Sequence, residues 1–177
     1  NPTKYIGQFY SEEQAGEFAK SRLWTMKKDA DRGWRRVVPS PTPLKVVEAV
    51  TLGKLVKDGT IVIAGGGGGI PVFIDKNGNL EGMDAVIDKD LASAVIGNEI
   101  GADTLAIMTS VDRVAINFHK PNQLLLDKMT VSDAKEYLAE GQFPDGSMGP
   151  KIKAAIQFIA HGGKLVTISD VKDAPNA

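Results

Sequence analysis

Residues 61–93 read IVIAGGGGGIPVFIDKNGNLEGMDAVIDKDLAS, and this stretch contains the strongest structural signals in the chain. The apolar run at residues 60–64 predicts a buried strand. Ligands of open α/β sheets bind at the carboxyl ends of strands, and consecutive glycines let several N–H groups turn toward one anion. We therefore expect an anion site, with a loop that merely needs positive φ as the alternative. The glycines are Gly65, Gly66, Gly67, Gly68 and Gly69.

Two common phosphate-binding motifs do not fit this glycine run. The Walker pattern, in which a second glycine is followed by Lys and Ser or Thr, does not occur. The dinucleotide pattern G-x-G-x-x-G would require a third glycine where Ile70 or Pro71 stands. The next residues, 72–74, are predicted to be extended rather than helical.

Helices and strands alternate outward from this stretch. From residue 44 onward the alternation predicts a three-layer αβα sandwich with a mainly parallel sheet. The Pro-rich break at 39–43 favours a separate subdomain before it. The predicted helices are 11–31, 44–58, 88–100, 130–140 and 147–161. The predicted strands are 34–38, 60–64, 72–74, 104–108, 114–118 and 165–168, with a hairpin turn at 75–79.

Composition narrows the class of protein. The 177 residues are 42% hydrophobic and 24% charged, with a formal net charge of −1, so a folded core is expected. The small charge argues against nucleic acid or an anionic membrane as a partner. The absence of cysteine excludes disulfides and thiolate metal sites and is compatible with the cytoplasm. His119 and His161 are isolated, which favours structural roles.

Two lysines stand at predicted helix starts. Lys89 lies between Asp88 and Asp90, and Lys151 follows Met148-Gly149-Pro150. The carboxylates alone are explained by helix capping. A lysine in the first turn, however, opposes the helix dipole unless an anion is bound. Both sites therefore suit a phosphoryl group in transfer, with Asp90 orienting the lysines. Asp112 follows a strand, where it either caps a turn or contacts a nucleotide.

Six segments together resemble the carbamate kinases, which are members of the amino-acid kinase family. They are NPTK at 1–4, WRRVVPSP at 34–41, GGGGGIPV at 65–72, AVIDKDL at 85–91, TSVDRV at 109–114 and MGPK at 148–151. The resemblance implies reversible phosphoryl transfer between carbamoyl phosphate and ADP, giving ATP and carbamate, with Mg²⁺. It further implies a cytoplasmic homodimer that serves arginine fermentation.

The resemblance also assigns roles to residues. Lys89 and Lys151 are expected to neutralise the phosphoryl group, and Asp90 to organise them. Lys4 is expected to reach the phosphate from a protruding lid at residues 1–38, next to a nucleotide-binding domain at 39–177. The five glycines are expected to face carbamate. The nucleotide is expected near Asp112, Phe118, Met148, Gly149 and Pro150.

The family's chains extend much further at the N-terminus, so we expect this chain to be a C-terminal fragment with little activity alone. Two alternatives stay open. One is another kinase of the superfamily, acting on acetylglutamate, aspartate or UMP. The other is a non-catalytic nucleotide-binding module that kept the fold.

Overall fold

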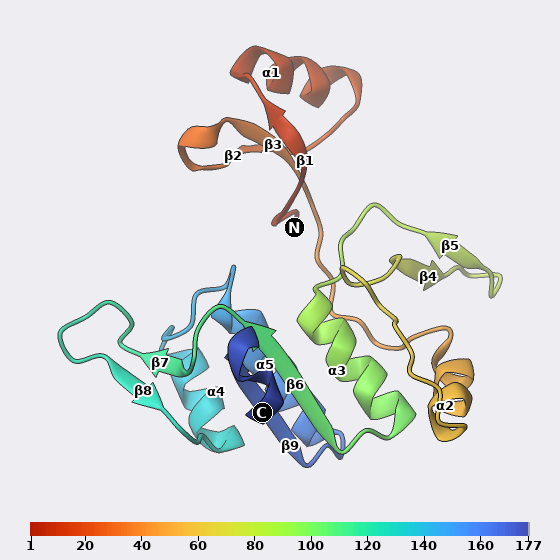
Figure 1. Ribbon diagram of the computed structural model, residues 1–177. Coiled ribbons are helices and arrows are strands. Elements are labelled where there is room, and N and C mark those ends of the chain that lie inside the picture. The colour runs from red at the N-terminus through yellow and green to blue at the C-terminus, as the bar shows by residue number, and fades with distance from the viewer. Residues whose placement is uncertain (177) are drawn as a thin grey trace. The chain divides into compact units, whose positions relative to one another are not determined.

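The computed structural model describes residues 1–176 and contains two compact units (Figure 1). The first unit contains residues 1–42 and 69–87, and the second contains residues 43–68 together with the chain from residue 88 onward. The lid predicted at residues 1–38 stays a prediction. The compact unit that contains those residues also includes residues 69–87.

The first unit contains a three-stranded antiparallel sheet of order β1–β3–β2. The predicted capping box of its helix is confirmed, because Ser11 accepts from the Gln14 amide and the Gln14 side chain accepts in return. Phe18 of this helix packs against Tyr10 and Trp24, with ring centroids 5.0 and 5.6 Å away. The elements are β1 (Lys4–Tyr10), α1 (Glu12–Ser21), β2 (Met26–Lys28) and β3 (Trp34–Val38).

The prediction of a single helix over 11–31 is wrong beyond Ser21. Leu23 adopts a left-handed backbone with φ of 54°, which ends the helical path. Residues Met26–Lys28 then pair with β3, where Lys27 lies opposite Arg35. Hydrogen bonds to a neighbouring strand thus outweigh the helical spacing of the apolar side chains.

The hairpin predicted around residues 75–79 is confirmed. Strand β4 (Val72–Ile74) pairs antiparallel with β5 (Leu80–Gly82). The Asp75 carboxylate accepts from the backbone amides of Asn77 and Asn79, each at 2.8 Å, and closes the turn. Gly78 has φ of 87°, a conformation that this turn requires and that glycine adopts without strain.

The second unit carries a parallel strand pair next to helices. β6 pairs with β9 in parallel register from Thr104 opposite Leu165 to Thr109 opposite Asp170, and α5 packs against both α3 and β9 (Figure 1). The elements are α2 (Ala49–Lys57), α3 (Lys89–Ile100), β6 (Thr104–Thr109), β7 (Val114–Ile116), β8 (Leu124–Leu126), α4 (Val131–Ala139), α5 (Met148–Ala160), β9 (Leu165–Asp170) and a 3₁₀ helix (Val171–Asn176). Strand β8, which pairs with β7, escaped the sequence prediction.

The core of this unit consists of two apolar clusters. Phe158 and Ile152, both on α5, are fully buried and belong to different clusters. Helix α5 therefore joins the two clusters and has little freedom to shift. None of the helices in residues 1–176 has the length and apolar character needed to cross a membrane.

Two further predictions in this unit are corrected. The helix predicted from residue 44 begins only at Ala49, with Glu48 as its N-cap. The strand predicted at 60–64 is not formed, and Ile61 and Ile63 are 94% and 98% exposed. A strand requires a hydrogen-bonded neighbour, and within residues 1–176 no segment pairs with this one.

Candidate active site

Helix α3 begins with a side-chain cap that fixes the backbone at the site. The Asp88 carboxylate accepts from the amides of Asp90 and Leu91 at 2.9 and 3.4 Å. Asp88 is itself buried. This cap satisfies two of the amides that a helix start leaves unpaired. It also sets the direction in which the Lys89 and Asp90 side chains leave the backbone.

Helix α5 begins differently, without a side-chain cap at Ser147. The Gly149 amide donates to the Pro144 carbonyl at 2.9 Å, and a β-carbon on Gly149 would lie 3.0 Å from that same oxygen. Glycine is needed here because any side chain would crowd this carbonyl. The tight turn places Lys151 in the first turn of the helix.

The two lysines converge on one carboxylate, that of Asp90. The Lys151 ammonium lies 3.0 Å from Oδ2 of Asp90, and the Lys89 ammonium lies 3.3 Å from both Asp90 oxygens. The Lys151 and Asp90 side chains are 11% and 9% exposed, whereas that of Lys89 is 58% exposed. The cluster therefore has one buried cation, one buried anion and one cation that reaches solvent.

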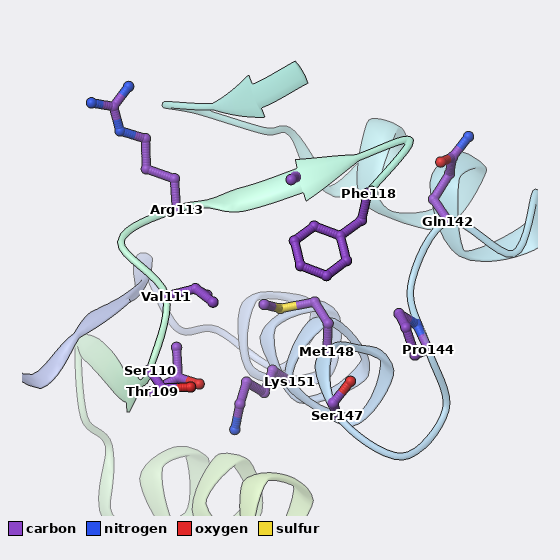
Figure 2. A pocket seen from close by; sticks show the side chains of 11 residues that line it. Thr109, Ser110, Val111, Arg113, Phe118, Gln142, Pro144, Ser147, Met148 and Lys151 are labelled. Carbon is purple, nitrogen blue, oxygen red and sulfur yellow. The ribbon is translucent and has the colours of Figure 1, made fainter. Parts of the chain in front are cut away.

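A pocket of about 140 Å³ lies beside Lys151. Figure 2 shows Phe118 on one side of the Met148 side chain and the Lys151 amine on the other. A second hollow of about 280 Å³ shares Phe118 with the first and adds Asp112 and Leu125. The first pocket is lined by Thr109, Ser110, Val111, Arg113, Ala115, Phe118, Gln142, Pro144, Ser147, Met148 and Lys151.

The predicted nucleotide residues are partly brought together here. Phe118 and Met148 line the first pocket, and Asp112 borders the second hollow. Gly149 and Pro150 continue α5 and are not among the lining residues; Gly149 instead shapes the turn before Lys151. The pocket begins where β6 ends at Thr109, which is where α/β sheets bind ligands.

Sequence reasoning missed several lining residues. Gln142 and Pro144 lie in the connection between α4 and α5, and no motif marks them. Thr109 and Ser110 lie two to three residues before Asp112, so their place at the end of a predicted strand was a usable signal. The remaining wall comes from β7 with its flanking turns and from the start of α5.

The glycine run spans the two units. Within the second unit, the Gly68 amide donates to the Gly65 carbonyl at 2.8 Å, and Gly65 and Gly66 have φ of 77° and 47°. A β-carbon on Gly65 would lie 3.1 Å from Ile96 of α3, so the loop passes close to that helix. Lys4 begins β1 of the first unit, and its predicted contact with phosphate stays a prediction.

This arrangement can bind a multiply charged anion. Two ammonium groups carried by two helix starts concentrate positive charge, and each helix dipole adds to it. Asp90 offsets part of that charge and holds the ammonium groups in place through charge-assisted hydrogen bonds. A phosphoryl group in transfer is such an anion.

The sequence profile of the amino acid kinase family matches residues 12–170. The chain belongs to the amino acid kinase family. The family membership and the αβα fold class predicted from the sequence are thereby confirmed. Within residues 1–176, the parallel pairing that the structure displays is that of β6 with β9.

Named relatives of this amino acid kinase chain are carbamate kinases. The carbamate kinase of Thermococcus kodakarensis is 51% identical over the whole chain, and that of Staphylococcus haemolyticus is 48% identical over 98% of it. The chain spans only 56% and 57% of the length of these two proteins. The predicted resemblance to carbamate kinases is confirmed.

Solved structures agree with this similarity. A crystal structure of an Aeropyrum pernix K1 protein superposes with a TM-score of 0.94 at 41% identity, covering 100% of this chain and 57% of that one. Carbamate kinase from Giardia lamblia bound to AMP-PNP superposes with a TM-score of 0.88 at 40% identity, covering 99% and 57%.

Proposed function

We propose that the protein transfers a phosphoryl group between carbamoyl phosphate and ADP, giving ATP and carbamate. The observation that carries this proposal is the convergence of Lys89 and Lys151 on Asp90 at two helix starts, 3.0 to 3.3 Å from its oxygens. The names of the relatives favour carbamate over acetylglutamate, aspartate or UMP as the partner substrate. Because the chain spans about half of those relatives, the activity is proposed for the longer protein.

The reaction exchanges one P–O bond for another. The bond from phosphorus to the carbamoyl oxygen breaks while a bond to the terminal phosphate oxygen of ADP forms. The charge carried by the three equatorial oxygens needs neutralising throughout. Lys151 and Lys89 are proposed to do this, since preorganised cations stabilise charge without reorganising during the reaction. Asp90 is a positioning residue that keeps both ammonium groups at this point.

The nucleotide is proposed to occupy the pocket beside Lys151. Its apolar walls, Phe118 and Met148, suit the flat face of a base, while the lysine end suits phosphates. Support comes from the Giardia lamblia relative, whose structure contains AMP-PNP. Asp112, Gly149 and Pro150 are proposed to contact the nucleotide, the glycine run to face carbamate, and Lys4 to approach the phosphate from the lid.

Among residues 1–176, no group of three or more His, Cys, Asp or Glu side chains could hold a metal ion. Mg²⁺ commonly binds through substrate phosphates with few protein ligands. We propose that Mg²⁺ arrives with the nucleotide. The homodimer, the cytoplasmic location and the role in arginine fermentation are likewise proposals from the family resemblance.

A full-length protein containing this chain tests the activity. ATP formation from carbamoyl phosphate and ADP is measured, and acetylglutamate, aspartate and UMP are offered with ATP in parallel. We expect turnover with carbamoyl phosphate alone. Use of one of the other three acceptors instead would assign a different kinase. Nucleotide binding without any turnover would favour the non-catalytic module.

The lysine assignment has a matched control on the same helix. Lys151→Met should lower turnover by well over tenfold, which corresponds to a loss of more than about 1.4 kcal/mol of transition-state stabilisation. Lys153→Met should leave turnover unchanged, because Lys153 is 51% exposed and pairs with Asp145. Circular dichroism confirms that both variants fold. A loss below tenfold for Lys151→Met refutes the role proposed for this lysine.

A further inference from the structure

The turn after β7 holds Phe118 between two left-handed residues. Asn117 and His119 have φ of 53° and 61°, and the His119 ring lies tilted against the Phe118 ring, with centroids 3.9 Å apart. Left-handed backbone is tolerated by Asn and His but is not their preferred state. Such a turn persists only where its surroundings hold it. Phe118 is 47% exposed, so packing alone restrains it weakly.

Two glutamine side chains hold this turn. The backbone amide of Asn117 donates to Oε1 of Gln142 at 2.9 Å, and the backbone amide of His119 donates to Oε1 of Gln123 at 2.9 Å. Gln123 lies within the β7–β8 connection, so its bond stays inside the turn. Gln142 lies in the α4–α5 connection, and Figure 2 shows it on a different segment from Phe118, so its bond to Asn117 joins two separate segments of the pocket wall.

The Gln142 amide has both of its ends engaged. Its Nε2 donates to Oε2 of Glu140 at 3.3 Å while its Oε1 accepts from Asn117. Although Gln142 lines the pocket, the group is already hydrogen-bonded on the protein side. The Gln142 side chain is therefore better suited to hold the pocket wall in place than to form hydrogen bonds with a ligand.

We propose that Gln142 is a positioning residue that sets the width of the nucleotide pocket. By tying the Phe118 turn to the connection that carries Pro144 and leads into Met148 at the start of α5, it fixes the distance between the two apolar walls. This inference rests on the proposed function, because it assumes that a base occupies this space. A base that fits between fixed walls loses less entropy than one that must order them.

The test uses steady-state kinetics of the full-length protein. Gln142→Met keeps the side-chain length but removes the acceptor. We expect its KM for ADP to rise up to about tenfold, the range of one net hydrogen bond. We expect kcat to change less than twofold and KM for carbamoyl phosphate to stay constant. Gln123→Met, which loosens the turn without cutting the bridge, should raise KM for ADP less.

A charge-neutral exchange provides the rescue. Glu140→Gln combined with Gln142→Glu keeps an acceptor for the Asn117 amide, preserves the donor–acceptor pair between the two side chains and leaves net charge unchanged. This double variant should return KM for ADP close to the starting value. A KM that stays as high as in Gln142→Met overturns the proposal.

Hydrogen exchange separates this inference from the proposed function. The backbone amide hydrogen of Asn117 should exchange with solvent faster in Gln142→Met than in the unchanged protein, whether or not nucleotide is bound. Faster exchange with an unchanged KM for ADP overturns the positioning role alone. A protein that neither binds nor turns over ADP overturns the proposed function, and the positioning role falls with it. If hydrogen exchange at the Asn117 backbone amide is unchanged in Gln142→Met, the hydrogen bond to Gln142 does not hold the turn, and the positioning role is overturned.

Discussion

The Lys151 ammonium lies 3.0 Å from the Asp90 carboxylate, and both side chains are nearly excluded from solvent. A pair of this kind contributes little to stability, because removing two charges from water costs about as much as their attraction returns. Breaking it is different, since the remaining charge is buried without a partner. The pair therefore suits a site that must present a cation to an anionic ligand better than it suits a structural core.

Asp90→Asn should destabilise the 177-residue chain by about 3 kcal/mol or more, because it leaves Lys151 buried without a countercharge. Lys89→Ala should cost less than about 1 kcal/mol, because Lys89 is 58% exposed. Urea denaturation followed by circular dichroism measures both. Equal losses for the two variants would contradict the asymmetry of the cluster.

Gly163→Ala should destabilise the chain by about 1–3 kcal/mol, the usual cost of overpacking. A β-carbon at Gly163 would overlap the ring of Phe158. Phe158 is fully buried, so its ring has little room to move away. Gly146→Ala is the control, since a β-carbon there meets no atom within 4 Å. Thermal unfolding of the two variants decides the matter, and equal melting temperatures would refute the close packing.

The Asp133 carboxylate should titrate below the ordinary aspartate value. The Thr130 hydroxyl, which donates to Asp133 at 2.7 Å, is the largest cause that lowers the pKa of this carboxyl, and the Thr130 amide adds to it. A lowered folded-state pKa means that this stabilisation is present above the ordinary pKa of about 3.9 and disappears as pH falls through the lowered value.

Asp133→Asn should accordingly reduce the free energy of unfolding at neutral pH, and its difference from the unchanged chain should vanish in acid. Glu136→Gln, on the same helix but outside the capping box, serves as control. An NMR titration reads the pKa directly. A difference in stability that grows as pH falls would have the wrong sign and would exclude this cause.

Substitution of Ile61 or Ile63 by Lys should change the stability of the 177-residue chain by less than about 0.5 kcal/mol, because both side chains are almost fully exposed. Ile107→Lys, in a buried position of β6, should unfold the chain. Denaturant titration compares the three variants. A loss of several kcal/mol at Ile61 would mean that this segment is a buried strand after all.

Much of the local structure of this protein could be predicted from residues that lie close together in the sequence. The capping box of Ser11 with Gln14, the turn at Asn77-Gly78 and the stop at Gly101 each depend on residues a few positions apart. Such signals act through neighbouring backbone groups, so they survive in almost any tertiary surrounding. The placement of Lys89 and Lys151 at helix starts followed from the same kind of reasoning.

Contacts between distant segments settled the rest. Lys151 and Asp90 are 61 residues apart, and their ion pair exists because α5 packs against α3. The run at 60–64 has the composition of a strand, yet it has no neighbour to pair with in residues 1–176. Gln142 reaches Asn117 only because two connections meet at one pocket. Pairing, packing and burial are properties of partners far along the chain, and a local pattern does not contain them.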